Sequence, residues 1–274
     1  MPKLFSVTTP IGNSEDITLR ALNVLKQNKN IFCEDTRVFK DLCRRLQIDF
    51  SDKKIYSFHD HSSEKQIESI LKLLETVDCV YVSDAGSPVI SDPAYPLLKE
   101  CFKREIEVDI VSGISSVTAS LEVSGLAPTP FHFHGFLQRE KSAVENFVDL
   151  CNQQYGTHII FEGVSRVQET LKILTKKMPS YEFAVVRELT KEYESVYRFI
   201  GRDFESIIDK IVYKGEFVIL IRNPIKKGNT TSSNLVETAE QIIAKGPKPK
   251  LISKLISQIT NKDAKEIYSL LNKK

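Results

Sequence analysis

The stretch VYVSDAGSPVISDP, residues 80–93, joins a short apolar run to a loop of small and polar residues. Its first part, Val80–Ser83, predicts a strand because β-branched and aromatic residues run directly into turn-forming ones. The same pattern recurs at four other places, Leu4–Thr8, Ile31–Glu34, Ile55–Phe58 and Val108–Val111. Helical periodicity fills the intervals between them, and such alternation predicts an α/β fold built on a parallel sheet.

The turns after these strands are the places where a ligand is expected, because open parallel sheets bind ligands at the carboxyl ends of their strands. They read TTPIGN (8–13), EDTR (34–37), SDAGSPVISDP (83–93) and SGISS (112–116). Each small residue alone is explained by a tight turn, but four such turns together predict a nucleoside-sized pocket. There is no GxxxxGK[ST] loop, and no GxGxxG follows the first strand, which disfavours a nucleoside triphosphate or a dinucleotide.

Three regions are expected along the chain. Residues 1–120 form a first α/β domain with the parallel sheet. Residues 121–223 contain longer alternating runs, which predict a second α/β domain with a mixed sheet. Residues 224–274 begin with a linker at 224–233 and continue as short helices in a basic tail.

The formal net charge of +2 conceals an uneven distribution of charge. Residues 1–221 carry 27 basic and 32 acidic side chains, a net charge of −5, whereas residues 222–274 carry 11 basic and 4 acidic ones, a net charge of +7. A basic tail on an acidic body is typical of proteins that bind a polyanion. Isolated lysines that merely keep short helices solvated are the alternative.

Several classes of protein are disfavoured by composition. No apolar run approaches the roughly 18 residues of a membrane helix, and the first residues lack a signal-peptide pattern, so a cytoplasmic protein is expected. Five cysteines without a CxxC pair indicate neither a disulfide framework nor a zinc ribbon. The pairs His59/His61 and His132/His134 lack a nearby third ligand, so no metal site is expected.

Five motifs occur in a fixed order: TTPIGNSEDITLRAL (8–22), EDTR (34–37), SDAGSPVISDP (83–93), EVSGL (122–126) with FHFHGFLQR (131–139), and RELTKEYE (187–194). In this order the chain resembles the bacterial 16S rRNA (cytidine 1402-2′-O)-methyltransferases, which belong to the tetrapyrrole-methylase superfamily. The resemblance implies two α/β domains with S-adenosylmethionine in a cleft between them, and a homodimer. It also implies an rRNA substrate in the small ribosomal subunit.

The resemblance also implies the residues that hold the methyl donor. They are Pro10, Gly86, Ser87, Pro88, Ser115, Ser116, Glu162, Leu189 and Thr190.

Methyl transfer to a ribose hydroxyl requires alignment of the hydroxyl with the methyl group and a group that takes the proton. Asp35 is the expected base, with Glu34 beside it, because both lie at the end of a predicted strand that faces the cleft. Arg37 is expected to hold a phosphate of a flipped nucleotide. The alternative is that these three residues form a helix cap and ion-pair cluster.

Further contacts with RNA are expected at His59, Arg166, Lys248 and Lys250. Two other functions remain open at this point. One is a methyltransferase that acts on a corrin or porphyrin precursor, and the other is a non-catalytic RNA-binding factor for ribosome assembly.

Overall fold

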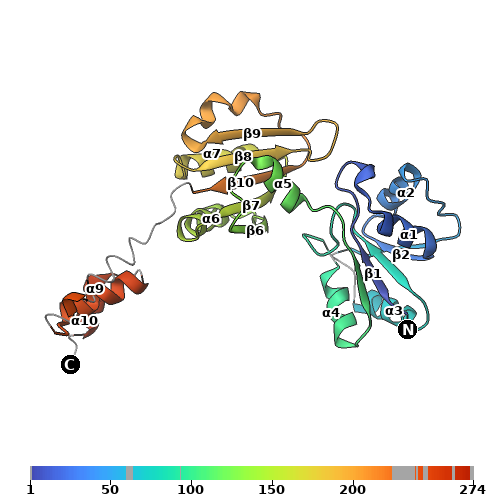
Figure 1. Cartoon of the computed structure of the whole chain (residues 1–274), viewed down its shortest axis with the longest axis horizontal. Coiled ribbons are helices and arrows are strands. Elements are labelled where there is room, and N and C mark those ends of the chain that lie inside the picture. The colour runs from blue at the N-terminus through green and yellow to red at the C-terminus, as the bar shows by residue number, and fades with distance from the viewer. Residues whose placement is uncertain are drawn as a thin grey trace. The chain divides into compact units, whose positions relative to one another are not determined.

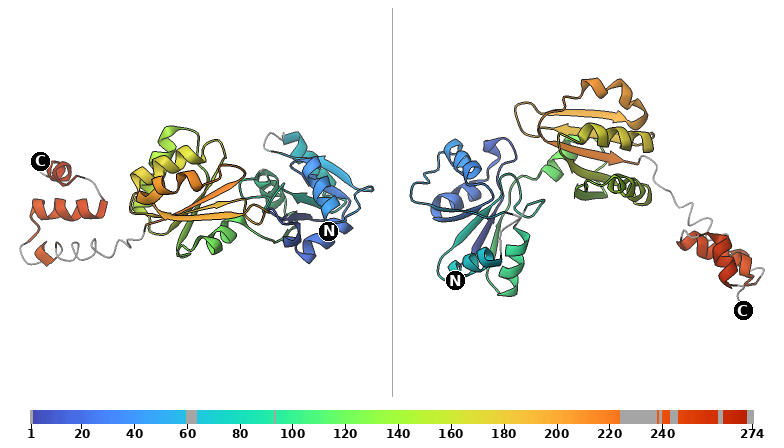
Figure 2. Two further views of the ribbon diagram at one scale, coloured as in Figure 1. Left: turned by 90° about the horizontal axis from the view of Figure 1, so that it is seen from above. Right: turned by 180° about the vertical axis from the view of Figure 1, so that it is seen from behind.

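A computed structural model describes residues 2–59, 64–92, 94–223, 238, 240–242, 246–260 and 263–271 of the chain. The chain forms two compact units, Met1–Asn223 and Pro224–Lys274. The first unit contains two five-stranded sheets with helices on both faces of each (Figures 1 and 2).

The first sheet is parallel throughout, with the strand order β3-β2-β4-β1-β5. Its strands are β1 (Leu4–Val7), β2 (Asn30–Cys33), β3 (Lys54–Ser57), β4 (Cys79–Val82) and β5 (Val108–Val111). A short 3₁₀ turn, η1 (Ser14–Asp16), precedes its helices, which are α1 (Leu19–Gln27), α2 (Thr36–Arg45), α3 (Glu64–Leu73) and α4 (Tyr95–Lys103). The expected parallel α/β sheet is confirmed.

Side chains that alternate along β4 build the core on both faces of this sheet. Val80 and Val82 pack with α1 and α2, whereas Cys79 and Tyr81 pack with α3 and α4. All four side chains are fully buried. A strand buried on both faces reads as a continuous apolar run, which is why this stretch was recognisable in the sequence.

The second sheet is mixed, with the strand order β6-β7-β10-β8-β9. Its strands are β6 (Phe131–Phe136), β7 (Thr157–Glu162), β8 (Glu182–Arg187), β9 (Ser195–Ile200) and β10 (Phe217–Arg222). Strands β6 and β7 are parallel, and the other pairs are antiparallel. The associated helices are α5 (Ser116–Ser124), α6 (Lys141–Gln153), α7 (Val167–Lys177), and the 3₁₀ turns η2 (Gly201–Ser206) and η3 (Ile208–Lys210).

Helix α5 packs on the second sheet although it follows directly from the first. Val117 and Leu121 lie in one apolar cluster with Leu220 of β10 and with Ile11 from the loop after β1. Residues 1–120 were expected to form the first domain, and this limit falls inside α5. The helix is instead one packing unit with the second sheet, because its buried face has its partners there.

The second unit contains α9 (Pro249–Thr260) and α10 (Ala264–Leu271), which pack against each other (Figure 1). Asp263 caps α10, because its Oδ1 accepts hydrogen bonds from the backbone N–H groups of Lys265 at 2.6 Å and Glu266 at 3.2 Å. The linker expected at 224–233 lies outside the described residues.

Three histidines stack where β6 pairs with β7. His158 Nε2 lies 3.0 Å from the carbonyl of Gln154, which fixes that nitrogen as the protonated one. Its Nδ1 therefore accepts a hydrogen bond from His134 Nε2 at 3.0 Å, and His132 stacks on the His158 ring. Burial lowers the pKa of His134 to about 4, and the neighbouring histidines add to this effect. In the described part of the chain, no group of three or more His, Cys, Asp or Glu is placed to hold a metal ion.

This cluster predicts that the protein loses stability in mild acid. The unfolded chain protonates His134 below its ordinary pKa of about 6.5, while the folded chain keeps it neutral down to about 4. As the pH drops from about 6.5 to about 4, the free energy of unfolding therefore decreases, by at most about 1.4 kcal/mol per pH unit for this group. The variant His134→Gln keeps a hydrogen-bond donor but does not titrate. We expect its free energy of unfolding, measured with urea, to fall less between pH 7 and pH 5 than that of the wild type. Equal falls in both proteins would contradict this account.

Candidate active site

A cavity of about 520 Å³ lies within the first unit, where loops of the two sheets meet. The first sheet contributes residues from the loops after β1, β2, β4 and β5, which are the four turns singled out in the sequence. The second sheet contributes Phe136, the segment 161–164 and the segment 215–218. We call this space the main cavity, and its volume suits a small-molecule ligand.

Two loops of the first sheet are joined by backbone hydrogen bonds. Thr9 N–H donates to the carbonyl of Gly86 at 3.0 Å, and Gly86 N–H donates to the carbonyl of Thr9 at 3.1 Å. Gly86 has a φ of +78°, which an L side chain rarely adopts. The Ser83 hydroxyl donates to the Gly86 carbonyl at 3.0 Å from within the loop. The SDAGSP loop thus has a fixed backbone along the wall of the main cavity.

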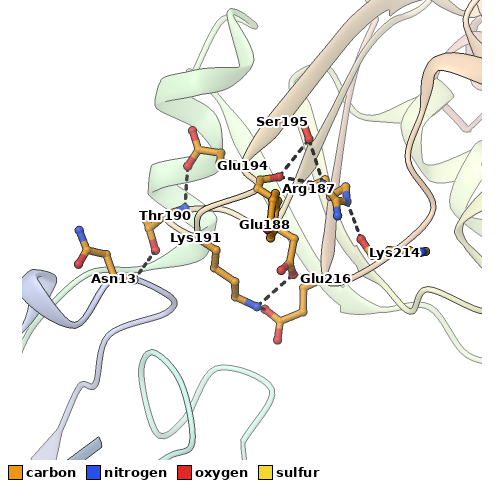
Figure 3. Close-up of polar contacts among 10 residues, drawn as sticks. Asn13, Arg187, Glu188, Thr190, Lys191, Glu194, Ser195, Lys214 and Glu216 are labelled. Carbon is orange, nitrogen blue, oxygen red and sulfur yellow. Dashed lines mark hydrogen bonds and ion pairs between the residues drawn. The ribbon is translucent and has the colours of Figure 1, made fainter. Parts of the chain in front are cut away.

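The loop after β1 also contacts the loop after β8 in the second sheet (Figure 3). Asn13 N–H donates to Thr190 Oγ1 at 3.1 Å. A Cβ at Gly12 would lie 2.5 Å from Lys191 Cγ and 2.6 Å from Thr190 Oγ1. The backbone of the first loop therefore approaches the second loop more closely than any residue with a side chain allows.

The charged residues of the RELTKEYE motif hold the loop after β8 in shape (Figure 3). The Arg187 guanidinium donates to the backbone carbonyls of Lys214 at 2.6 Å and Tyr193 at 2.8 Å. Glu188 Oε1 accepts from Lys191 Nζ at 3.1 Å and from Glu216 N–H at 2.8 Å. These bonds tie the loop to the segment 214–216, part of which lines the main cavity.

Glu162, at the end of β7, lines the main cavity with both carboxylate oxygens already bonded. Its Oε1 accepts from Arg166 Nε at 2.9 Å and from Gly163 N–H at 2.8 Å, and its Oε2 accepts from Thr170 Oγ1 at 2.7 Å. Arg166 also donates to the carbonyl of Leu137 at 2.9 Å. The structure thus places Arg166, expected at RNA, in a network that holds the cavity wall.

Of the residues expected to hold a ligand or carry the chemistry, six line the main cavity. They are Glu34, Gly86, Ser87, Ser115, Ser116 and Glu162. The other four expected binding residues do not line the cavity in the part of the chain that the structure describes. Pro10 and Pro88 flank lining residues in their loops, Leu189 packs in the apolar cluster with α5, and Thr190 bonds Asn13.

Asp35 has the geometry of a helix cap. Its Oδ1 accepts from Arg37 N–H at 2.7 Å at the start of α2, and its Oδ2 pairs with Arg37 Nη2 at 2.6 Å. The Arg37 side chain and these bonds lower the pKa of Asp35 to about 2. A carboxylate with so low a pKa is a weak proton acceptor. The geometry matches the alternative of a cap and ion pair, and it makes Asp35 a poor base. Arg37 as a phosphate ligand stays a prediction.

The remaining expected RNA contacts are exposed. His59 follows the buried Phe58 after β3, and Lys248 and Lys250 lie in the second unit at the start of α9.

Some lining residues were not singled out from the sequence. Phe136 and Phe161 come from neighbouring strands, and their rings lie edge to face at 5.5 Å on the cavity wall. Asp84 stands inside the SDAGSP motif and was passed over in favour of its small neighbours. Gly215 has a φ of +86°, and the turn Lys214-Gly215-Glu216 before β10 was the available signal for this part of the wall.

The family model of the Tetrapyrrole (Corrin/Porphyrin) Methylases matches residues 3–203. The chain belongs to this family. Curated relatives named "Ribosomal RNA small subunit methyltransferase I" match most of the chain. The protein of Mycoplasma pneumoniae is 32% identical over 99% of both chains, and that of Rickettsia prowazekii is 36% identical over 99% of this chain and 96% of its own. That of Thermotoga maritima is 38% identical over 81% of this chain and 98% of its own.

Solved structures of the tetrapyrrole-methylase kind share the fold. A cobalt precorrin-4 methyltransferase has a TM-score of 0.61 at 18% identity, covering 80% of this chain and 94% of its own. Uroporphyrin-III C-methyltransferase from Thermus thermophilus, complexed with S-adenyl homocysteine, has a TM-score of 0.55 at 17% identity, covering 81% and 97%. The family, the two-sheet α/β fold and the methyltransferase class that the sequence predicted are confirmed.

The close approach at Gly12 makes a prediction about ligand binding. We expect Gly12→Ala to push the loop after β1 away from Thr190 and Lys191 and to weaken S-adenosylmethionine binding about tenfold, or about 1.4 kcal/mol. Isothermal titration calorimetry measures this. The thermal unfolding midpoint of Gly12→Ala is measured alongside, to show that a loss of affinity does not come from a loss of folded protein. Unchanged affinity in Gly12→Ala would contradict the assignment of this contact to the binding site.

Proposed function

We propose that this chain transfers the methyl group of S-adenosylmethionine to the ribose 2′-hydroxyl of a cytidine in small-subunit rRNA. Cytidine 1402 of 16S rRNA is the nucleotide that the motif resemblance implies. The observation that carries the proposal is the main cavity, formed by the strand-end loops that hold the family motifs. We further propose that the chain works in the cytoplasm as a homodimer, as the resemblance implies.

The residues of the main cavity fit S-adenosylmethionine. Five carboxylates line it, those of Glu34, Asp84, Asp92, Glu162 and Glu216, and no lysine or arginine is found among its described lining residues. This charge suits a ligand with a positive sulfonium and a positive ammonium group. Phe136 and Phe161 supply an apolar wall for a flat ring. When bound, the donor supplies an electrophilic methyl group.

The chain's own residues then have two tasks. They hold the hydroxyl in line with the methyl carbon, and they accept the proton that the hydroxyl loses. A cavity surrounded by fixed backbone loops suits the first task, since the loops at Gly86 and Gly12 are held by bonds and by close packing.

The acidic main cavity disfavours a polycarboxylate tetrapyrrole, the first alternative substrate. RNA is also an anion and therefore needs a basic surface elsewhere on the protein. The second unit provides one, since Lys250, Lys254 and Lys265 line a groove of about 490 Å³ beside Tyr268. Lys248 lies just before α9. We propose that this surface contacts rRNA phosphates, with aromatic stacking at Tyr268.

The lengths of the relatives support an accessory role for the second unit. The Thermotoga maritima relative covers 81% of this chain with 98% of its own length, and the Hydrogenobaculum relative covers 80% with 95% of its own. The stretch of this chain that each of these two relatives matches is about as long as the first unit, Met1–Asn223. We infer that the first unit carries the chemistry and that the second unit adds affinity for RNA.

The proposed reaction is tested by incubating the full chain with methyl-labelled S-adenosylmethionine and one of three substrates: small ribosomal subunits, naked 16S rRNA, or a precorrin. We expect label in the rRNA, recovered as a 2′-O-methylated cytidine after nuclease digestion. Label in the precorrin alone would support the tetrapyrrole alternative. Absence of donor binding in calorimetry would support the non-catalytic assembly factor.

The basic groove makes a separate prediction. Replacing Lys250, Lys254 and Lys265 together by glutamine should weaken RNA binding and lower the slope of log affinity against log salt by about 2–3, since each lost phosphate contact contributes about 0.7–0.9. The matched control replaces three exposed lysines of the first unit, Lys26, Lys72 and Lys176. We expect the affinity for S-adenosylmethionine to stay the same in both. Equal salt slopes for the two variants would refute the role of the groove.

A further inference from the structure

The five carboxylates that line the main cavity differ in how they are held. Glu162 uses both oxygens in bonds to Arg166, Gly163 and Thr170. Glu216 is largely exposed, and its Oε2 pairs with Lys191 Nζ at 3.0 Å. Neither of these two is well placed to accept a proton, because a neighbouring cation or donor already stabilises its charge.

Only one of the two carboxylate oxygens of Asp84 accepts a hydrogen bond within the described part of the chain. It follows β4 directly after Ser83, and its Oδ1 accepts a hydrogen bond from Asp35 N–H at 3.0 Å. In the described part of the chain, this is the one hydrogen bond that its carboxylate makes. The carboxylate is thus oriented by the backbone at the start of α2, while its second oxygen keeps its capacity to accept a proton.

The surroundings of Asp84 favour proton acceptance. The side chain is partly buried, and this burial raises its pKa above the ordinary value, with the negative charge of Asp35 adding to the shift. The hydrogen bond from the Asp35 N–H and the positive charge of Arg37 act in the opposite direction. A carboxylate with a raised pKa is a stronger base than an ordinary one.

Asp35 and Asp84 are therefore complementary in role. The carboxylate of Asp35 caps α2 and pairs with Arg37, and its backbone N–H orients Asp84. The EDTR motif thus contributes a backbone N–H group to the site, while the Asp35 carboxylate itself is engaged in the cap and the ion pair.

We propose that Asp84 is the general base of the methyl transfer. This inference rests on the proposed function. The ribose 2′-oxygen attacks the sulfonium methyl carbon, so that an O–C bond forms as the C–S bond breaks. The bonding pair stays on sulfur and leaves a neutral thioether, and the 2′-hydroxyl proton passes to the free oxygen of Asp84. Release of this proton to water restores the carboxylate.

The test compares Asp84→Asn with Asp35→Asn in the full chain. Asparagine at 84 keeps an oxygen for the Asp35 N–H, and asparagine at 35 remains a good helix cap, so both variants are expected to fold. With small subunits and enough S-adenosylmethionine to saturate each variant, Asp84→Asn should lower the single-turnover rate about 10²–10⁴-fold. Asp35→Asn should keep its rate within about threefold.

A pH profile separates a base from a structural residue. The wild-type rate should rise with pH through the pKa of Asp84 to a plateau, and the residual rate of Asp84→Asn should lose this rise. The charged groups near Asp84 are Asp35 at the N-cap of α2 and Arg37 in its first turn, with Glu34 and Asp92 in the same cavity. A near-normal rate in Asp84→Asn, or a loss of donor binding that accounts for its defect, would overturn the inference. A wild-type chain that transfers no methyl group would overturn the proposed function and the inference with it.

Discussion

The packing of the Gly12–Asn13 backbone against Thr190 and Lys191 is the contact on which the main cavity depends. It leaves no room for a side chain at Gly12, and it joins a loop of the parallel sheet to a loop of the mixed sheet. The loop after β8 keeps its shape because the side chains of Arg187 and Glu188 make hydrogen bonds within it and to the neighbouring segment 214–216. Ile11, next to Gly12, adds an apolar anchor in the cluster that contains α5 and the second sheet.

Charge is divided between the parts of the chain in a way that suits two ligands of opposite sign. The main cavity presents carboxylates, which suit a cationic methyl donor, and the lysines of the second unit suit a polyanion. The net charge of +2 for the whole chain is the sum of these two specialised parts. Electrostatic complementarity thus supports both halves of the proposed reaction from different regions of the sequence.

Much of the fold was predictable from the sequence, because buried parallel strands such as β4 read as apolar runs that end in turn residues. The four strand-end turns were also identified, and six expected site residues line the main cavity. The position of α5 was not predictable, since the apolar face of Val117 and Leu121 fits either sheet equally well at the level of pattern. Asp35 and Asp84 are both aspartates at strand ends. Their difference lies in which hydrogen bonds each accepts, and this depends on contacts between loops 49 residues apart.

The most direct test of the account is the mapping of ribose 2′-O-methylation on small-subunit rRNA from cells with and without this protein. The account predicts that one cytidine, at position 1402, loses its 2′-O-methyl group in cells that lack the protein and regains it when the wild-type chain is restored. An unchanged pattern of ribose methylation in those cells would contradict it.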